Sequence, residues 1–425
     1  MARSRFARIK FSGVVLTALL ALTACTPGMD PEPTPTAAPE TPSPEPYAGP
    51  AIFTGDELTA LLFTSDEIAA LLPGSTEIGE PSSVLAQISD GGGPLPIPEI
   101  CSVLFVEQSL WSIGSRNVRW TTTADSDYRF GAMMALQFAD EAHAQARMDQ
   151  LVEASSQCAN FDFAGAATFE SVRPVESDDV RAVAGTVTLP ESEGGNSTFL
   201  GYAAVGNVLV QVSQSINGEA IPDAEVITKK LHERAEEARA ALTQEFTANP
   251  PTPDAEAETD ESAPWSEWAI SAGGVGLIHL GDPIADAVAA GQAARVIEPA
   301  GAGYPWKLVN AERTGSILVA TTDDGSAVAS ITVGNERIFD EDAQDGAALP
   351  LRGGVRVGAP IADAIAVFPG GTTVTVASSG DDWYDVATRD GRLFRFHTDR
   401  DVVDPGAVII GITVEDATKR PLRFS

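Results

Sequence analysis

The chain has 425 residues, of which 44% are hydrophobic and 20% are charged, so it is long enough for two or three domains with sizeable cores. Its formal net charge of −33 excludes a nucleic-acid partner, because there is no basic surface to displace the counterions of a phosphate backbone. The same charge repels an anionic lipid surface, so any membrane attachment must come from a feature other than the folded surface.

The first 24 residues predict a bacterial lipoprotein signal peptide. A basic segment (residues 3–10) precedes an apolar stretch (residues 14–22) that is too short to span a bilayer. The stretch ends in Leu22-Thr23-Ala24-Cys25, which resembles the lipobox. This resemblance implies that residues 1–24 are removed and that the Cys25 thiol carries diacylglycerol. The alternative is an ordinary secretory signal with a coincidental cysteine.

A Pro-rich tether is predicted at residues 25–50, where nine prolines lie among Thr, Glu and Ala. Two or more acyl chains, such as palmitate, are enough for stable anchoring, and we expect the tether to hold the folded part away from the lipid. The predicted location is therefore the extracytoplasmic face of the cell membrane. An acidic, Pro-rich linker at residues 247–264 separates a first segment (51–246) from a second segment (265–425).

The first segment predicts an α+β fold with a mainly antiparallel sheet flanked by helices. Thr54-Gly55-Asp56-Glu57 and Thr64-Ser65-Asp66-Glu67 are capping-box patterns, each expected to begin a short helix. Asp140 is expected to begin a helix that ends near Cys158, and Asp223 to cap a final helix with an apolar face. Alternating patterns predict strands at residues 118–123, 132–138, 180–189, 199–204 and 208–216.

Two cysteines, Cys101 and Cys158, remain once Cys25 is assigned to the lipid. They lie 57 residues apart and no CxxC motif is present, which favours a structural disulfide over two free reactive thiols. A disulfide also fits an oxidising, extracytoplasmic compartment.

Several features of the first segment resemble the PknH-type extracellular sensor domain, a family found on actinobacterial receptor kinases and on free lipoproteins. They are the Glu57-Leu58-x-x-Leu61-Leu62 pattern, Cys101 shortly after Pro98, and Phe138-x5-Ala144 leading to Cys158. The resemblance implies a helix-flanked sheet with a cleft for an unidentified ligand, and no enzymatic activity. That family typically has two disulfides, whereas this sequence can form one.

The second segment contains an internal repeat, with copies at about 275–351 and 352–425. Residues 280–288 match residues 357–365 at an offset of 77, and Trp306 maps to Trp383 at the same offset. Each copy predicts a helix plus an antiparallel sheet, a layout similar to the tandem modules of β-lactamase-inhibitor-like proteins. We expect the matched tryptophans to anchor helix to sheet, with a ligand-stacking pair as the alternative. The helix residues expected to lie on the sheet are Ile284, Val288, Ile361 and Ile365.

Candidate catalytic and metal-binding residues are few. HExxH, GxSxG and phosphate-binding loop motifs are absent from the sequence, so we predict no catalytic residue, metal or cofactor. His143 and His232 are expected on the polar faces of helices. His279 and His397 are expected in strands of different copies as ordinary strand residues, with a metal pair across the repeat axis as the alternative. Acidic turns at residues 322–325 and 399–404 allow weak calcium binding but fit hairpin turns better.

The sequence therefore predicts a membrane-anchored, non-enzymatic lipoprotein that binds a ligand or acts as a sensor. The alternative is a lipoprotein that docks an envelope protein, and a cell-wall enzyme is a minor third. A deep cleft of several hundred Å³ in residues 51–246 would favour an unknown small-molecule ligand. A broad exposed apolar patch on the repeats would favour an envelope protein as the partner.

Overall fold

The computed structural model describes residues 46–87, 95–105, 111–122, 130–172, 181–190, 195–216, 221–252, 254, 258–301, 303–340 and 344–422. The predicted signal peptide, the lipobox and almost all of the predicted tether lie outside these residues. Glu45–Ser425 form one compact unit. Within the described ranges, we find no helix with the length and apolar character needed to cross a bilayer.

Both capping-box patterns begin short helices, as predicted. A 3₁₀ helix, η1 (Gly55–Leu61), follows Thr54, and α1 (Ser65–Leu71) follows Thr64. The Thr64 amide donates to the Glu67 carboxylate at 2.8 Å, and the Glu67 amide donates back to the Thr64 hydroxyl at 3.3 Å. These bonds satisfy backbone donors that the first turn of a helix leaves unpaired.

The first segment contains an eight-stranded antiparallel sheet. Its order is β1-β3-β4-β9-β8-β7-β6-β5, so most neighbours in the sheet are also neighbours in the chain. The bounds are β1 (Ser75–Thr76), β3 (Gly114–Thr122), β4 (Gly131–Gln137), β5 (Phe161–Asp162), β6 (Ala166–Val172), β7 (Arg181–Thr188), β8 (Ser197–Val205) and β9 (Val208–Ile216). The predicted α+β class and the antiparallel pairing are confirmed.

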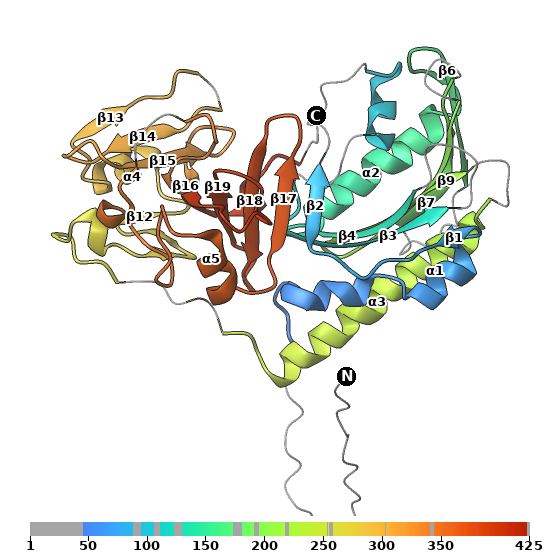
Figure 1. The fold of residues 1–425 in the computed structure, drawn as a ribbon, viewed down its shortest axis with the longest axis horizontal. Coiled ribbons are helices and arrows are strands. Elements are labelled where there is room, and N and C mark those ends of the chain that lie inside the picture. The colour runs from blue at the N-terminus through green and yellow to red at the C-terminus, as the bar shows by residue number, and fades with distance from the viewer. Residues whose placement is uncertain are drawn as a thin grey trace, which may run out of the picture. The chain divides into compact units, whose positions relative to one another are not determined.

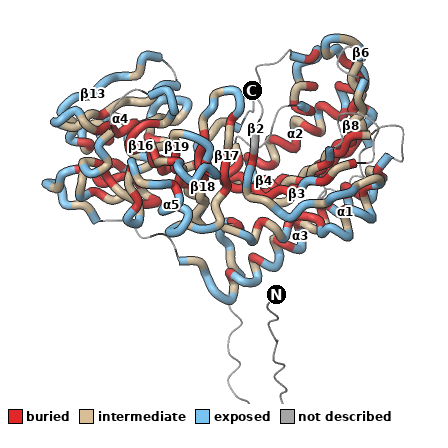
Figure 2. The backbone as a smooth tube through the Cα atoms, in the orientation of Figure 1, coloured by how far each residue is buried: buried red, intermediate tan, exposed pale blue. Residues whose placement is uncertain are grey.

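Helices cover both faces of this sheet (Figure 1). On one face, α3 (Ala224–Ala248), α1 and η1 enclose a core that includes Leu231, Met133 and Val210. On the other, α2 (Glu141–Gln157) and the 3₁₀ helix η2 (Glu99–Leu104) enclose a core that includes Met148 and Leu136. The central strands β4, β7, β8 and β9 contribute side chains to both cores, which explains why buried residues dominate along them in Figure 2.

A nine-stranded sheet forms the centre of the second segment. Its order is β13-β14-β15-β16-β20-β19-β18-β17-β2, with two consecutive four-strand meanders joined through β16 and β20. The bounds are β13 (Arg295–Ile297), β14 (Trp306–Val309), β15 (Ser316–Thr321), β16 (Val328–Gly334), β17 (Thr372–Val376), β18 (Asp381–Ala387), β19 (Leu393–Thr398) and β20 (Ile409–Glu415). A small sheet, β10 (Ile270–Ser271), β11 (Gly274–Val275) and β12 (Ile278–His279), precedes α4 (Ile284–Ala290), and α5 (Ile361–Val367) precedes β17.

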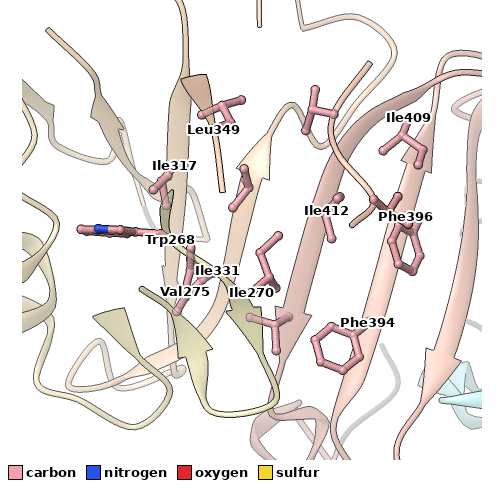
Figure 3. Close-up of a cluster of buried hydrophobic side chains, with 14 of the residues drawn as sticks. Trp268, Ile270, Val275, Ile317, Ile331, Leu349, Phe394, Phe396, Ile409 and Ile412 are labelled. Atoms are coloured by element: carbon pink, nitrogen blue, oxygen red, sulfur yellow. The ribbon is translucent and has the colours of Figure 1, made fainter. Parts of the chain in front are cut away.

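One face of the nine-stranded sheet carries the core of this segment (Figure 3). Ile317, Ile331 and Ile412 come from three neighbouring strands, and Phe394 and Phe396 extend the apolar surface along β19. Of the four helix residues expected on the sheet, Ile361 is buried and Ile284 and Val288 are partly buried. Ile365 is exposed, so its assignment was wrong. Ala364 is buried instead, because α5 presents Ile361 and Ala364, three residues apart, to the core.

The strand β2 (Val84–Gln87) belongs to the first segment by sequence but pairs in parallel with β17 of the second segment. Leu85 is almost fully buried and packs with Val374, Val376 and Trp383, while Met134 of β4 contacts the same cluster. The two predicted segments therefore share one sheet, and the predicted domain boundaries remain predictions.

Candidate functional site

The predicted disulfide joins Cys101 of η2 to Cys158, the residue directly after α2. Both cysteines are fully buried in the core beneath α2. Closing a loop of this length stabilises the fold by about 3–4 kcal/mol in the entropic account. The bond is structural in its placement, because neither sulfur is accessible to a partner.

Trp306 and Trp383 match in the sequence but occupy opposite faces of the nine-stranded sheet. Trp306 pairs with Val319 and packs against the core, whereas Trp383 pairs with His397 and packs with Leu85 on the other face. The strand registers of the two copies thus differ by one residue here, and such a shift reverses the direction of a side chain. The two rings do not form one matched ligand-stacking pair, and a stacking role for either remains a prediction.

The helical histidines are buried, so their predicted position on polar helix faces was wrong. His143 is 2% exposed, with Nδ1 2.7 Å from Asp140 Oδ1 and Nε2 3.0 Å from the carbonyl oxygen of Arg420. His232 is 8% exposed, with Nε2 3.3 Å from Glu236 Oε1. His143 is buried because the C-terminal residues of the second segment pack over the start of α2.

His397 lies in β19, as predicted, within a chain of hydrogen bonds that crosses the centre of the nine-stranded sheet. Its Nε2 lies 2.8 Å from the Thr413 hydroxyl, which lies 2.7 Å from the Thr332 hydroxyl. Thr332 in turn donates to the Glu336 carboxylate at 2.8 Å. Thr332 and Thr413 are direct partners where the two meanders join. Burial lowers the pKa of His397 to about 3, with the nearby positive charge of Arg395 as a further cause.

A second polar group lies beside His397 on the same face. Arg395 donates two hydrogen bonds to the Asp385 carboxylate, at 2.8 and 2.9 Å, and its guanidinium carbon lies 4.2 Å from the centre of the Trp383 ring. The Trp383 indole also donates to Asp385, at 3.0 Å. Every group in this cluster has a partner, so the arrangement fits a structural role in holding adjacent strands together.

The acidic turns behave as hairpin turns. Asp324 accepts hydrogen bonds from the hydroxyl of Thr322 and from the amide and hydroxyl of Ser326, and these bonds lower its pKa to about 2. Asp399 pairs with Arg400 and accepts from the Val408 amide. Across the residues that the structure describes, no three His, Cys, Asp or Glu side chains are grouped so that they could hold a metal ion.

A hollow with a volume of about 840 Å³ lies beside the C-terminal half of α3. One wall is the extended segment 47–51, which the chain enters from the predicted tether, and another is the exposed side of α3, with Val205 of β8 beside them. The residues that line it are Tyr47, Ala48, Gly49, Ala51, Val205, Glu236, Arg239, Ala240, Thr243, Gln244 and Thr247.

The segment 47–51 is fixed against α3 by specific contacts. The Tyr47 amide donates to the Thr247 hydroxyl at 3.0 Å, and the Tyr47 ring contacts Phe246 edge-on, with centroids 5.1 Å apart. Sequence reasoning missed this hollow, because residues 47–50 were assigned to the tether. The sequence does contain one sign of this site. Arg239, Thr243 and Thr247 recur every four residues in α3, so these polar residues lie on one face of the helix.

No protein-family model matches the chain, and no curated protein matches it. Among solved structures, the chain is similar to the extracellular domain of PknH from Mycobacterium tuberculosis, with 14% identity over 48% of this chain and 99% of that chain, and a TM-score of 0.29. It is also similar to a putative uncharacterised protein from Mycobacterium smegmatis, with 17% identity over 45% and 98% of the two chains and a TM-score of 0.23. Because both TM-scores are below 0.5, we draw nothing about function from either likeness.

Proposed function

We propose that this chain is a lipid-anchored, extracytoplasmic and non-enzymatic protein that binds a small ligand in the hollow beside α3, in a sensory or ligand-capture role. The observation that carries the proposal is the hollow itself, whose volume of about 840 Å³ falls in the range of small-molecule sites. It is built from a rigid helix and a segment pinned to that helix, so its walls exist before a ligand arrives.

Two features support the extracytoplasmic location. Leu22-Thr23-Ala24-Cys25 matches the lipobox at each position, and the buried Cys101–Cys158 disulfide requires an oxidising compartment to form and persist. In this arrangement, Cys25 anchors the chain and the Pro-rich tether places the hollow close to the point where the folded part begins. The acidic surface of the folded part, which an anionic lipid surface repels, then stays in solvent.

Anchoring is tested by the mass of the N-terminal peptide of the native, membrane-purified protein. We expect peptides that begin at an acylated Cys25, and we expect the Cys25→Ala variant to leave the membrane fraction. An unacylated N-terminus in the native protein, or retention of residues 1–24, would refute the anchor.

Ligand capture is tested by native mass spectrometry of the full chain purified gently from cells. Ala240 is exposed on α3 and lines the hollow, so Ala240→Trp should obstruct the hollow without disturbing a core. We expect a co-purified small molecule with the wild type and none with Ala240→Trp. Recovery of a stoichiometric envelope protein with both, and of no small molecule, would favour the docking alternative instead.

A further inference from the structure

The hollow beside α3 contains a positively charged group that has no acidic partner. Arg239 lines it and is half-buried, and in the part of the chain that the structure describes no carboxylate pairs with its guanidinium. The chain has 60 acidic residues and 27 lysines and arginines, so an arginine has many acidic groups with which it could pair. A guanidinium left unpaired inside a hollow is therefore informative about what the hollow receives.

The guanidinium of Arg239 lies against the backbone of a neighbouring turn. Gly206, in the turn between β8 and β9, has φ +57, and a Cβ atom built on it would lie 2.4 Å from the Arg239 guanidinium carbon. The guanidinium therefore lies directly against the Gly206 backbone. Glycine is needed there for its positive φ and for this close approach.

The remaining polar groups of the hollow are mostly committed to other partners. The Tyr47 hydroxyl donates to the Pro50 carbonyl, and the Thr243 and Thr247 hydroxyls donate to helix carbonyls one turn earlier. The Glu236 carboxylate lies beside the buried His232 ring at 3.3 Å.

Among the residues that line the hollow, the Arg239 guanidinium and the Gln244 amide are therefore the side-chain donors available to a ligand. Glu236 and Gln244 also bring acceptor oxygens to the hollow, so the group that distinguishes the site is the charged donor Arg239, which fits a ligand with an anionic acceptor group.

We infer that the hollow binds a small molecule through an oxyanion, a carboxylate or phosphate group, held by Arg239 with Gln244 beside it. The planar guanidinium presents paired N–H groups that match two oxygens of such a group. The apolar body of the ligand lies against Tyr47, Val205 and Ala240. The inference rests on the proposed function, because it names the ligand class for the same hollow.

The test is calorimetric titration of the full chain in detergent with three probes that share a phenyl ring: phenyl phosphate, benzoate and the neutral phenyl glucoside. We expect at least one of the two anions to bind the wild type and the glucoside to bind more weakly. Arg239→Gln should weaken anion binding about ten-fold or more, because it removes the positive charge and the paired N–H donors of the guanidinium. Lys229→Gln removes an exposed cation of the same helix outside the hollow and should change binding less than about two-fold.

Ala240→Trp separates the two proposals. Loss of binding by Ala240→Trp together with loss by Arg239→Gln supports both. If Arg239→Gln binds the anions as well as the wild type, or neither anion binds the wild type, the oxyanion assignment is overturned. The proposal that the hollow binds a ligand is still supported if the glucoside, or a molecule co-purified with the wild type, binds the wild type but not Ala240→Trp. Circular dichroism of each variant shows whether lost binding reflects lost folding.

Discussion

The imidazole Nε2 of His143 lies 3.0 Å from the carbonyl oxygen of Arg420, which is 277 residues further along the chain. The other ring nitrogen, Nδ1, lies 2.7 Å from the Asp140 carboxylate. Arg420 also holds residues of both segments through its guanidinium, which donates to the Trp111 carbonyl at 2.9 Å and to the Glu415 carboxylate at 2.7 Å. The start of α2 and the end of the chain are thus joined by a small set of buried polar contacts.

Replacing His143 should loosen the C-terminal residues from α2. In His143→Ala, both ring contacts are lost, so we expect a loss of about 1–3 kcal/mol of unfolding free energy. Hydrogen exchange of residues 417–422 should become faster. The control is His279→Ala, which removes an exposed histidine of β12 and should leave both measurements unchanged. Unchanged exchange in His143→Ala would show that the contact is not needed to hold this end of the chain.

Burial of His397 makes stability depend on pH below neutrality. Its pKa is about 3 in the folded chain and near 6.5 when exposed to water, so the unfolded state takes up a proton first as pH falls. The contribution is fully present above pH 6.5 and is lost progressively between pH 6.5 and pH 3, at about 1.4 kcal/mol per pH unit. Urea unfolding at a series of pH values should show this decrease in unfolding free energy, added to the pH dependence that the carboxylates contribute.

The His397→Gln variant isolates that slope. Glutamine keeps an amide that can bond the Thr413 hydroxyl but has no proton to titrate in this range. The difference in unfolding free energy between the wild type and His397→Gln should therefore fall as pH is lowered from 6.5. A difference that stays constant with pH would mean that His397 is accessible to protons in the folded chain.

Removal of the disulfide should destabilise the fold without changing its secondary structure. The double variant Cys101→Ala, Cys158→Ala should lose about 3–4 kcal/mol of unfolding free energy, because the unfolded chain regains the freedom that the closed loop removes. The wild type after reduction, measured by the same urea titration, should agree with the variant. Equal stability of the oxidised and reduced wild type would contradict the account.

Truncation of Leu85 should weaken the shared sheet. Leu85 is 1% exposed among Val374, Val376 and Trp383, so Leu85→Ala should cost about 2–5 kcal/mol. Its neighbour Val84 is 37% exposed, and Val84→Ala should cost less than about 1 kcal/mol. Similar costs for both would show that β2 is not packed as described.

The elements that could be predicted from sequence are those determined by nearby residues. The Thr64 and Glu67 side chains cap α1 from within one turn, and the apolar stripe of α3 is visible over a few turns. The features that could not be predicted depend on distant partners. Nothing in Val84–Gln87 marks it as a strand of another segment's sheet. Likewise, only Arg420 and the residues beside it explain why the helical His143 is buried.

The tryptophan pair shows a different limit. Trp306 and Trp383 align without a gap, and a sequence comparison cannot detect that the strand pairing of one copy is offset by a single residue. The candidate ligand site was missed for a further reason, since Tyr47 lies in a Pro-rich stretch whose composition is typical of a linker. Its contact with Phe246 depends on where α3 ends in the folded chain.

The parallel pairing of β2 with β17 also constrains the order in which the molecule can mature. During synthesis, β2 leaves the ribosome long before β17 is made. The pairing of β2 with β17 can therefore form only after most of the chain has been synthesised. A truncated product that ends before residue 372 would keep an unsatisfied strand with Leu85 facing water, a hazard for self-association. Because of the shared sheet, the first segment can complete its fold only once the second repeat copy has been made.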